Sequence, residues 1–344
     1  MRFVNNTWYC AGWSGELGDT PFGRTYNDKP IVFYRDESGA PVALGGACPH
    51  RFAPLAQGRV TGDRIVCPYH GLEFDRSGAC VHNPHGTGAI PPNARVETYP
   101  VIEKNGAIWL WLGDPAEADP SLLSDTDWLL SPDYAVITGY LKVNANYQLV
   151  TDNLLDLTHA PFLHPDTLGG RPEDSFGDRM HHDFRMEDGN VIHSDYHVSP
   201  MPRPTPQMMP LWGDRPSLFS SKMTWRPTAR MELDINLRNT DPASDEEIHV
   251  PSLHYLAPET QTSTHYFFAM GRNVKIDDSE QTEIMARFAR IAFEQEDEPM
   301  IRQVQEMMGT TDLFSLRPAI LETDIAAVQA RRIVEKMRKR EVRA

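Results

Sequence analysis

The sequence predicts an α+β protein of two domains, an all-β domain followed by a larger one in which an antiparallel sheet is flanked by helices. Three observations lead to this expectation. The chain has 344 residues, of which 40% are hydrophobic, and this is enough to bury two cores. Short apolar runs between turn residues dominate residues 1–112, whereas helical patterns occur later. Residues 113–133 are rich in Pro and Asp, so we expect a connection there and a second domain over 134–344.

The first domain is expected to be a small barrel or sandwich. Ile31–Tyr34 and Val42–Leu44 are apolar runs on either side of a turn-rich connection, Asp36–Pro41. Arg95–Glu103 and Ala107–Leu112 flank an Asn-Gly dipeptide, which is the strongest short hairpin signal. Many short strands at such close intervals are typical of this architecture.

The second domain combines strand and helix patterns. Hydrophobic residues alternate with polar ones over 231–237, as in a half-buried strand. Thr151–Leu163, Asp278–Met308 and Thr323–Arg340 are the candidate helices. Pro200–Pro216 holds so many prolines that we expect an irregular, mobile segment.

The composition excludes several classes of function. A formal net charge of −15 argues against a binder of nucleic acid or anionic membranes, because the partner would be repelled. No apolar run approaches the ~18–20 residues that a membrane span needs, and the N-terminus lacks a secretory signal. We therefore expect a cytoplasmic protein whose four cysteines do not form disulfides. Nothing in the sequence places Cys10 or Cys80 beside a base, and both are expected to be small buried side chains.

The other two cysteines belong to matching loops. Cys48-Pro-His50 and Cys67-Pro-Tyr-His70 each offer one thiolate and one imidazole, and two such loops can clamp one metal centre. Tetrahedral zinc is one candidate. A Rieske [2Fe–2S] cluster, with two thiolates on one iron and two imidazoles on the other, is the second. Most zinc fingers pair Cys with Cys and His with His, so the mixed order favours the cluster.

A second candidate metal site lies at Asp152–His164, where His159 and His164 are five residues apart. This spacing puts them on different faces of a regular helix, but Pro161 permits a distortion that brings the rings together. Asp156 and His159 share a face, as expected for a carboxylate that orients a metal-bound imidazole. Two histidines and one carboxylate form the facial triad of non-haem Fe(II) oxygenases.

The loop sequences CPHRFAPL and CPYHGLEFD resemble the Rieske loops of the Rieske non-haem iron oxygenases, a family of ring-hydroxylating and demethylating enzymes. GLEFDRSGACVHNPHG, at Gly71–Gly86, and the opening Asn6–Tyr9 are most similar to the family's oxygenases for vanillate and dicamba O-demethylation. The resemblance covers nearly the whole chain and implies a Rieske domain over 1–112 and a catalytic mononuclear iron domain over 134–344.

The resemblance also implies the ligands of both cofactors. The Rieske cluster is expected on Cys48, His50, Cys67 and His70. The pattern D-N-L-x-D-x-x-H-x-x-x-x-H is similar to the family's iron-site helix, in which both histidines, here His159 and His164, bind Fe(II). The family's third ligand is an aspartate in a late Glu-Asp pair, which matches Asp297, and Asn153 is expected near the iron.

Further roles rest on the same resemblance. Asp156 is expected to bridge an iron-bound histidine to His70 of an adjacent chain, so that electrons cross between subunits and the enzyme is a homotrimer. His265 aligns with a substrate-contacting histidine, and Phe288 stands where a relative has a pocket tryptophan.

The expected function is that of a terminal oxygenase in a multicomponent Rieske monooxygenase. It would use O₂, and electrons from NAD(P)H delivered by a separate ferredoxin or reductase, because the chain has no Gly-rich dinucleotide fingerprint. The expected reaction is O-demethylation of a methoxylated aromatic acid with release of formaldehyde. Hydroxylation of a ring, methyl or N-methyl group is the nearest alternative, and a zinc-stabilised binding module or a pure electron carrier are alternatives of other classes. The basic stretch Arg331–Arg343 is either a solvated helix end or a landing patch for an acidic ferredoxin.

Overall fold

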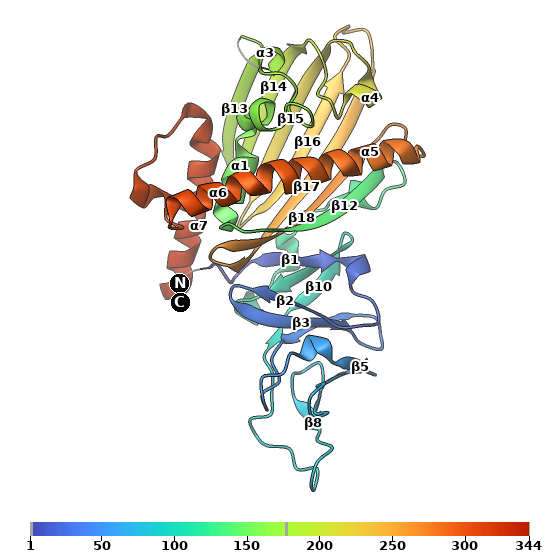
Figure 1. The fold of residues 1–344 in the computed structure, drawn as a ribbon, viewed down its shortest axis with the longest axis vertical. Coiled ribbons are helices and arrows are strands. Elements are labelled where there is room, and N and C mark those ends of the chain that lie inside the picture. Colours follow the sequence, from blue (N-terminus) through green and yellow to red (C-terminus); the bar gives the residue numbers. More distant parts are fainter. Residues whose placement is uncertain (1–2, 176–177, 344) are drawn as a thin grey trace. The chain divides into compact units, whose positions relative to one another are not determined.

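A computed structural model describes residues 3–175 and 178–343 of the chain (Figure 1). The chain divides into two compact units. The first comprises Met1–Asp125 with Ala257–Thr260, and the second comprises Thr126–Leu256 with Gln261–Ala344. The boundary after Asp125 falls inside the segment that was expected to connect two domains. That segment forms three 3-10 turns, η3 (Pro115–Glu117), η4 (Pro120–Leu122) and η5 (Asp127–Leu129).

The first unit consists of three small sheets. One has the order β1-β11-β10, another β2-β3-β4-β9 and the third β5-β6-β7-β8, and all their described pairings are antiparallel. The strands are β1 (Trp8–Trp13), β2 (Phe22–Tyr26), β3 (Lys29–Arg35), β4 (Pro41–Gly45), β5 (Arg59–Thr61), β6 (Arg64–Val66), β7 (Glu73–Phe74), β8 (Cys80–His82), β9 (Thr98–Tyr99), β10 (Val101–Lys104) and β11 (Ala107–Trp111). Two short turns, η1 (Ser14–Glu16) and η2 (Leu55–Gln57), complete it.

The expected hairpins of this unit are present, with one difference. The run Arg95–Glu103 is not one strand, because it is divided between β9 and β10 at Pro100. Proline has no backbone N–H and cannot donate to a sheet ladder, which explains the interruption.

The second unit is built on one seven-stranded sheet with the order β12-β18-β17-β16-β15-β14-β13. The described pairings within it are antiparallel, as the sequence predicted. The strands are β12 (Ala135–Val143), β13 (Met180–Glu187), β14 (Val191–Met201), β15 (Ser217–Arg226), β16 (Arg230–Arg238), β17 (Glu247–Thr260) and β18 (Ser263–Arg272).

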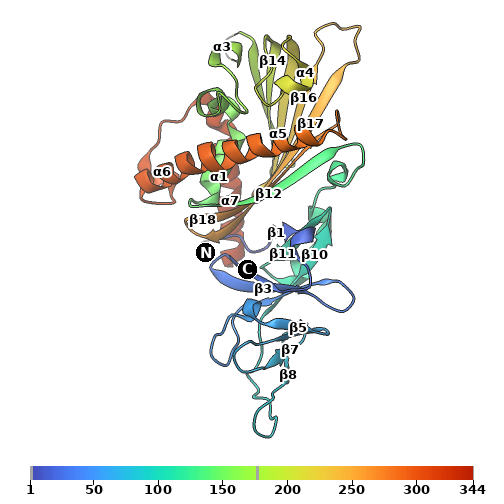
Figure 2. The same cartoon turned by 45° about the vertical axis from the view of Figure 1, so that its right-hand side comes forward.

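Helices cover one face of this sheet, and a long one crosses it (Figures 1 and 2). This long helix is continuous from α5 through α6, with a π-helical segment, η7, in its middle. π-Helical segments are rare and frequently mark functional sites. The helical elements are α1 (Tyr147–Leu155), η6 (Leu157–His159), α2 (Ala160–Leu163), α3 (Pro172–Ser175), α4 (Met209–Trp212), α5 (Ser279–Arg290), η7 (Ile291–Asp297), α6 (Glu298–Met308), η8 (Leu313–Leu316), η9 (Glu322–Asp324) and α7 (Ile325–Arg343).

The helix expected at Thr151–Leu163 is interrupted, but for a different reason from the one predicted. α1 begins at Tyr147 and stops before Asp156, whose carboxylate accepts a hydrogen bond from the backbone N–H of Thr158 (2.9 Å) and caps the next turn. Pro161 lies in the first turn of α2, where a proline is tolerated. The break therefore comes from the cap at Asp156, and the distortion attributed to Pro161 is not observed.

Two more expectations concern regions outside the sheet. Pro200–Pro216 is largely irregular, but it contains α4 and buries Met208 and Trp212, so it packs as part of the second unit. None of the described helices is long and apolar enough to span a bilayer.

Candidate functional site

Two loops of the first unit have the same backbone course. The backbone N–H of Cys48 donates to Ala53 and that of Cys67 to Leu72, at 2.9 and 2.8 Å. In each loop the fourth residue after the cysteine takes a positive φ, 58° at Phe52 and 70° at Gly71. A left-handed conformation is uncommon for a phenylalanine, so the loop shape is imposed by its surroundings.

These loops bring four soft ligands together. Cys48 and Cys67 are buried in the same core cluster of this unit. The rings of His50 and His70 lie 4.5 Å apart, measured between centroids, with His50 exposed and His70 half-buried. The thiols therefore occupy the inner side of the site and the imidazoles its outer side.

The environment fits a metal cluster. Nδ1 of His70 is buried and has no hydrogen-bond partner among the described residues, as expected of an atom reserved for a metal. Burial raises the pKa of Cys48 to about 11, opposed by the backbone N–H groups of His50 and Arg51. A bound iron would supply the positive charge that a thiolate needs at this buried position. The four residues expected as ligands thus lie on two matching loops, whereas Cys10 and Cys80 are buried outside these loops, on β1 and β8.

The second site lies in the second unit, where three segments converge. Nε2 of His159, at the end of η6, lies 3.7 Å from Oδ1 of Asp297, and Nε2 of His164 lies 3.1 Å from the same oxygen. Asp297 ends the π-helical segment η7 and is 5% exposed. One ligand atom from each of the three residues lies within 4.8 Å of the others, close enough to hold one ion.

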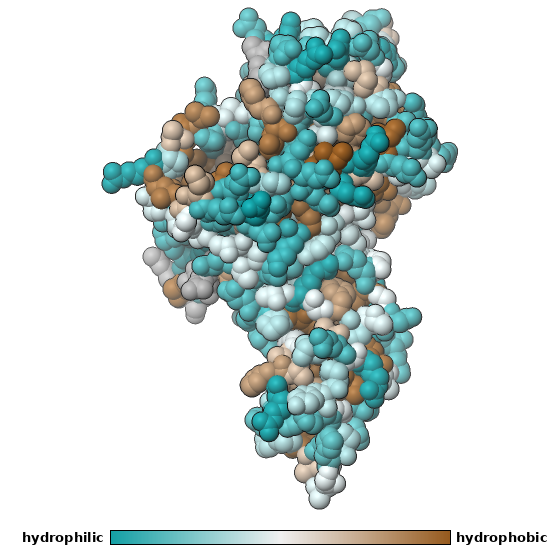
Figure 3. Space-filling model, viewed as in Figure 1, coloured by the Kyte–Doolittle hydropathy of each residue, from teal (hydrophilic) through white to brown (hydrophobic). Residues whose placement is uncertain are grey.

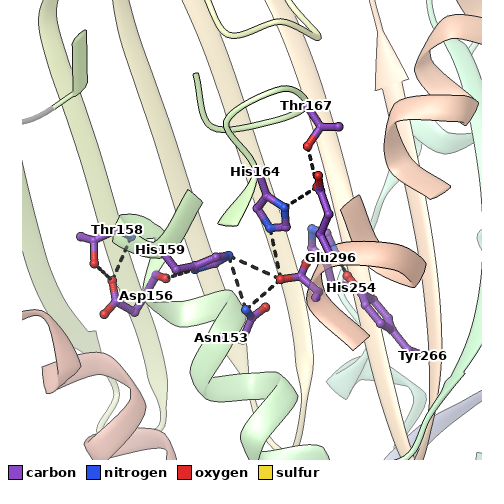
Figure 4. A network of polar contacts seen from close by, with 10 residues as sticks. Asn153, Asp156, Thr158, His159, His164, Thr167, His254, Tyr266 and Glu296 are labelled. Carbon is purple, nitrogen blue, oxygen red and sulfur yellow. Dashed lines mark hydrogen bonds and ion pairs between the residues drawn. The ribbon is translucent and has the colours of Figure 1, made fainter. Parts of the chain in front are cut away.

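Hydrogen bonds orient both imidazoles for this purpose (Figure 4). Nδ1 of His159 is 2.6 Å from the backbone oxygen of Asp156, and Nδ1 of His164 is 2.8 Å from the carboxylate of Glu296. Both acceptors require a proton on Nδ1, which leaves the Nε2 lone pair of a neutral ring free to bind a metal. The donor set of two imidazoles and one carboxylate fits a mononuclear iron with open positions.

The electrostatics of the site keep negative charge beside the rings. Burial lowers the pKa of His164, but hydrogen bonds and charge from Asp297 and Glu296 outweigh it, so that the pKa lies above its ordinary value. Asn153, on α1, donates from Nδ2 to Oδ1 of Asp297 at 3.0 Å and lies 3.4 Å from Nε2 of His159. Asn153 is therefore placed beside the three ligands, as expected.

The carboxylate of Asp156 does not contact His159, contrary to the sequence-based expectation. It binds the backbone N–H and hydroxyl of Thr158, and it accepts a hydrogen bond from the hydroxyl of Thr323 at 3.0 Å. Because α1 ends at this residue, its backbone oxygen is available to His159 in place of its side chain. Glu296, which the sequence did not distinguish from a solvated acidic face, orients His164.

A mostly apolar cavity of about 140 Å³ opens onto these ligands. His159, His164, Asp297 and Asn153 line one side of it. The sheet supplies the opposite wall, largely through Val198, Met201, Phe219, Leu233, Ile235 and Met270. No lysine or arginine lines the cavity among the described residues.

His254, on β17, lines the cavity on the side of the sheet. It was not singled out from the sequence. Its Nε2 is 2.8 Å from the hydroxyl of Ser252 and its Nδ1 is 2.7 Å from that of Tyr266, and all three side chains are buried. Burial lowers the pKa of His254 to about 4, so the ring is uncharged near neutral pH. Side chains two positions apart on a strand share a face, so Ser252 and His254 lie on the same face of β17.

The structure does not place His265 in the cavity wall. On β18 its neighbour Tyr266 faces the helices, so His265 points to the other side of the sheet, where its Nδ1 meets the hydroxyl of Tyr140 at 2.9 Å. Phe288, on α5, lines a second hollow that shares Gly169 and Met201 with the cavity.

The basic C-terminal stretch is partly structural. Arg331 is buried and binds both carboxylate oxygens of Asp152, on α1, and Arg338 donates to the hydroxyl of Tyr147. These two arginines anchor α7 to α1 and are not available as a landing patch.

Comparisons with known proteins agree with this arrangement. A Rieske [2Fe-2S] domain matches residues 7–100, and the C-terminal domain of vanillate O-demethylase oxygenase matches residues 143–340. The chain is 36% identical to the oxygenase component of dicamba O-demethylase from Stenotrophomonas maltophilia, over 98% of both chains. It is 35% identical to the oxygenase component of chloroacetanilide N-alkylformylase from Rhizorhabdus wittichii, over 97% of this chain and 95% of the relative. The crystal structure of dicamba monooxygenase bound to dicamba superposes with a TM-score of 0.91, at 36% identity and over 99% of both chains.

The Rieske match decides between the two candidates for the first site in favour of the [2Fe–2S] cluster over zinc. The cofactors are this cluster and a mononuclear iron, as in the crystal structure of dicamba monooxygenase with non-heme iron. The chain therefore belongs to the Rieske non-haem iron oxygenases and is a monooxygenase of that family.

Proposed function

We propose that the protein is the terminal oxygenase of a multicomponent system that removes a methyl group from a methoxylated aromatic acid and releases formaldehyde. The observation that carries this proposal is the apolar cavity of about 140 Å³ that opens onto His159, His164 and Asp297. Its size and lining suit one substituted aromatic ring. The similarity to the oxygenase component of dicamba O-demethylase supports the same reaction.

The residues of the cavity have distinct tasks in this proposal. His159, His164 and Asp297 hold the mononuclear iron, and Asp156 (through its backbone) and Glu296 orient the two imidazoles. When bound there, the iron supplies the activation of O₂. The apolar wall places the methoxy carbon toward these ligands and excludes water from its surroundings.

Electron delivery requires other proteins. As an oxygenase component the protein works with separate electron-transfer partners, which we propose to be a ferredoxin, an NAD(P)H-dependent reductase, or both, in the cytoplasm. A docking role for the basic end of α7 is limited to its exposed residues, such as Lys336, Lys339 and Arg340. The cluster is assigned to Cys48, His50, Cys67 and His70.

We also propose a homotrimer in which Asp156 connects the iron site of one chain to His70 of the next. Apolar side chains remain exposed over α6 and the segment that follows it (Figure 3). They include Met300, Val304, Met307, Phe314, Leu316, Ile320 and Leu321. Exposed apolar side chains gathered in one region support an interface between subunits.

The test is a turnover assay with a panel of methoxylated aromatic acids. The purified oxygenase would be combined with NADH, a ferredoxin and a reductase, and formaldehyde and the phenol product would be measured against NADH and O₂ consumed. We expect one of the acids to give formaldehyde and phenol in equal amounts. A hydroxylated product without formaldehyde would contradict O-demethylation and favour hydroxylation.

Removal of an N-linked group is the second candidate. It is favoured by the similarity to chloroacetanilide N-alkylformylase and by the absence of lysine and arginine from the described cavity wall, which suits an uncharged amide. Formation of a secondary amide from an N-alkylated anilide in the same assay distinguishes the two reactions.

A further inference from the structure

One buried hydroxyl in the cavity wall has no hydrogen-bond partner among the described residues. Ser221, on β15, is 3% exposed and lines the cavity, and its Oγ makes no hydrogen bond with any described residue. Buried polar side-chain atoms are nearly always satisfied, and leaving a hydroxyl unpaired has a cost in free energy. An unpaired hydroxyl that faces a cavity is therefore placed to bind whatever fills the cavity.

The neighbours of Ser221 isolate it. In the register of the sheet it lies between Tyr196 on β14 and Ile235 on β16, and Phe219 precedes it on the same face. The other serine of the wall, Ser252, is already hydrogen-bonded to His254. Among the described buried polar side-chain atoms without a partner, the Oγ of Ser221 is the one that lines this cavity.

We propose that Ser221 determines specificity by hydrogen-bonding a ring substituent of the substrate. The substrate class is an aromatic ether that carries, besides its methoxy group, a hydroxyl or carboxyl group on the side of the ring that faces β15. The serine hydroxyl both donates and accepts, so it binds either group. This inference rests on the proposed function, because it assumes that an aromatic ring occupies the cavity.

The chain provides a matched control for this residue. Ser217 lies on the same strand and, four residues earlier, on the same face; it is fully buried, and its Oγ also has no partner among the described residues. It does not belong to the wall of the cavity. Each of the two substitutions thus removes one buried, unpaired hydroxyl from β15. Ser221→Ala removes it from the cavity wall, and Ser217→Ala removes it outside the cavity.

The experiment measures equilibrium binding of three probes to the iron- and cluster-loaded protein by dialysis without reductant. The probes are anisole, 3-methoxybenzoate and vanillate, which share the aryl methyl ether and successively add a carboxylate and a phenol hydroxyl. We expect at least one added group to tighten binding to the wild type. For a probe that carries such a group, we expect Ser221→Ala to raise the dissociation constant about threefold to tenfold, the range of one hydrogen bond. The dissociation constant of anisole should be unchanged. Ser217→Ala is expected to leave all three dissociation constants unchanged.

Several results would overturn the inference. The first is that the added groups tighten binding equally in the wild type and in Ser221→Ala. The second is that neither group tightens binding to the wild type. The third is that Ser217→Ala and Ser221→Ala change the dissociation constants equally. Cluster absorbance and iron content, measured on each variant, show that the sites are intact. Because these are binding measurements, a failure to release formaldehyde in the turnover assay would count against the proposed function and not against the role of Ser221.

Discussion

The cluster loops of the first unit are held by contacts between residues close together in the sequence, whereas the iron site of the second unit joins His164 to Asp297 across 133 positions. In the loops, backbone bonds from Cys48 to Ala53 and from Cys67 to Leu72 fix the geometry locally. In the iron site, the geometry depends on how α1, α2 and the π-helical segment pack on one sheet. A change in the first region should therefore act on its own cofactor, while the second region should respond to substitutions at a distance.

The largest effect is expected from removing a cluster ligand. Cys67→Ser should abolish the visible absorbance and the acid-labile sulfide of the protein and, with them, all turnover, because a serine oxygen is a poor replacement for a thiolate. Cys80→Ala is the matched control, since this cysteine is buried nearby as a free thiol. Loss of the cluster in Cys80→Ala as well would show that packing, and not ligation, decides its presence.

A distant ion pair is expected to support the iron site. Asp152 precedes Asn153 on α1, and Arg331 is its bidentate partner. Arg331→Ala leaves the half-buried carboxylate of Asp152 without a positive charge to balance it. Breaking a fully buried pair costs about 3–5 kcal/mol. Because the Asp152 side chain is 23% exposed, we expect the protein's free energy of unfolding, measured by denaturant titration, to fall by about 2–3 kcal/mol. Arg332→Ala, an exposed neighbour on α7, should change it by less than about 0.5 kcal/mol. Equal effects of the two substitutions would show that the ion pair of Arg331 with Asp152 does not stabilise the protein.

Orientation of His164 is expected to matter for iron affinity. Glu296→Gln weakens the acceptor at Nδ1, so iron should bind about 10- to 100-fold more weakly. Anaerobic Fe(II) titration of protein that retains its cluster measures this directly. Glu294→Gln, exposed on the same segment, serves as the control and should leave the affinity unchanged. An unchanged affinity in Glu296→Gln would show that the hydrogen bond has no positioning role.

The smallest effect concerns pH. Burial holds the pKa of His254 at about 4, below its ordinary value of 6.5, so the unfolded chain takes up a proton at this residue before the native protein does. Stability is then fully present above pH ~6.5 and is lost as the pH falls toward 4. At pH 5.5 this loss amounts to about 1 kcal/mol. His254→Gln should lose correspondingly less stability between pH 7.5 and 5.5, and an identical pH dependence in both proteins would contradict it.

The comparison also shows what the sequence could predict. The candidate cluster ligands could be named from the sequence because C-x-H and C-x₂-H encode both the donors and their loops in one short stretch. His159 and His164 were found as a pair, but their convergence was attributed to a distortion at Pro161. The helix is instead interrupted before both histidines, at Asp156, and this cap depends on where α1 ends. Asp297 could be named only by resemblance, since its contact with the histidines is made by tertiary packing.

The substrate cavity was the least predictable part. His265 was named by resemblance, and His254, on the neighbouring strand, was not singled out. The sequence alone could not correct this choice, because it does not say which face of a fully buried strand meets the helices. β18 is buried at every position and therefore shows no alternation from which to choose. The unpaired hydroxyl of Ser221 likewise becomes visible only when the cavity is known.

The assignment of two separate metal sites is tested by the metal content of ligand variants. We predict that His159→Ala and Asp297→Ala retain the absorbance and the reduced-state electron paramagnetic resonance signal of the cluster. Their iron should fall from about three to about two atoms per chain, the number that the cluster holds. His265→Ala should retain all of its iron. Unchanged iron in Asp297→Ala, or loss of the cluster together with the mononuclear iron, would contradict the assignment of two separate metal sites.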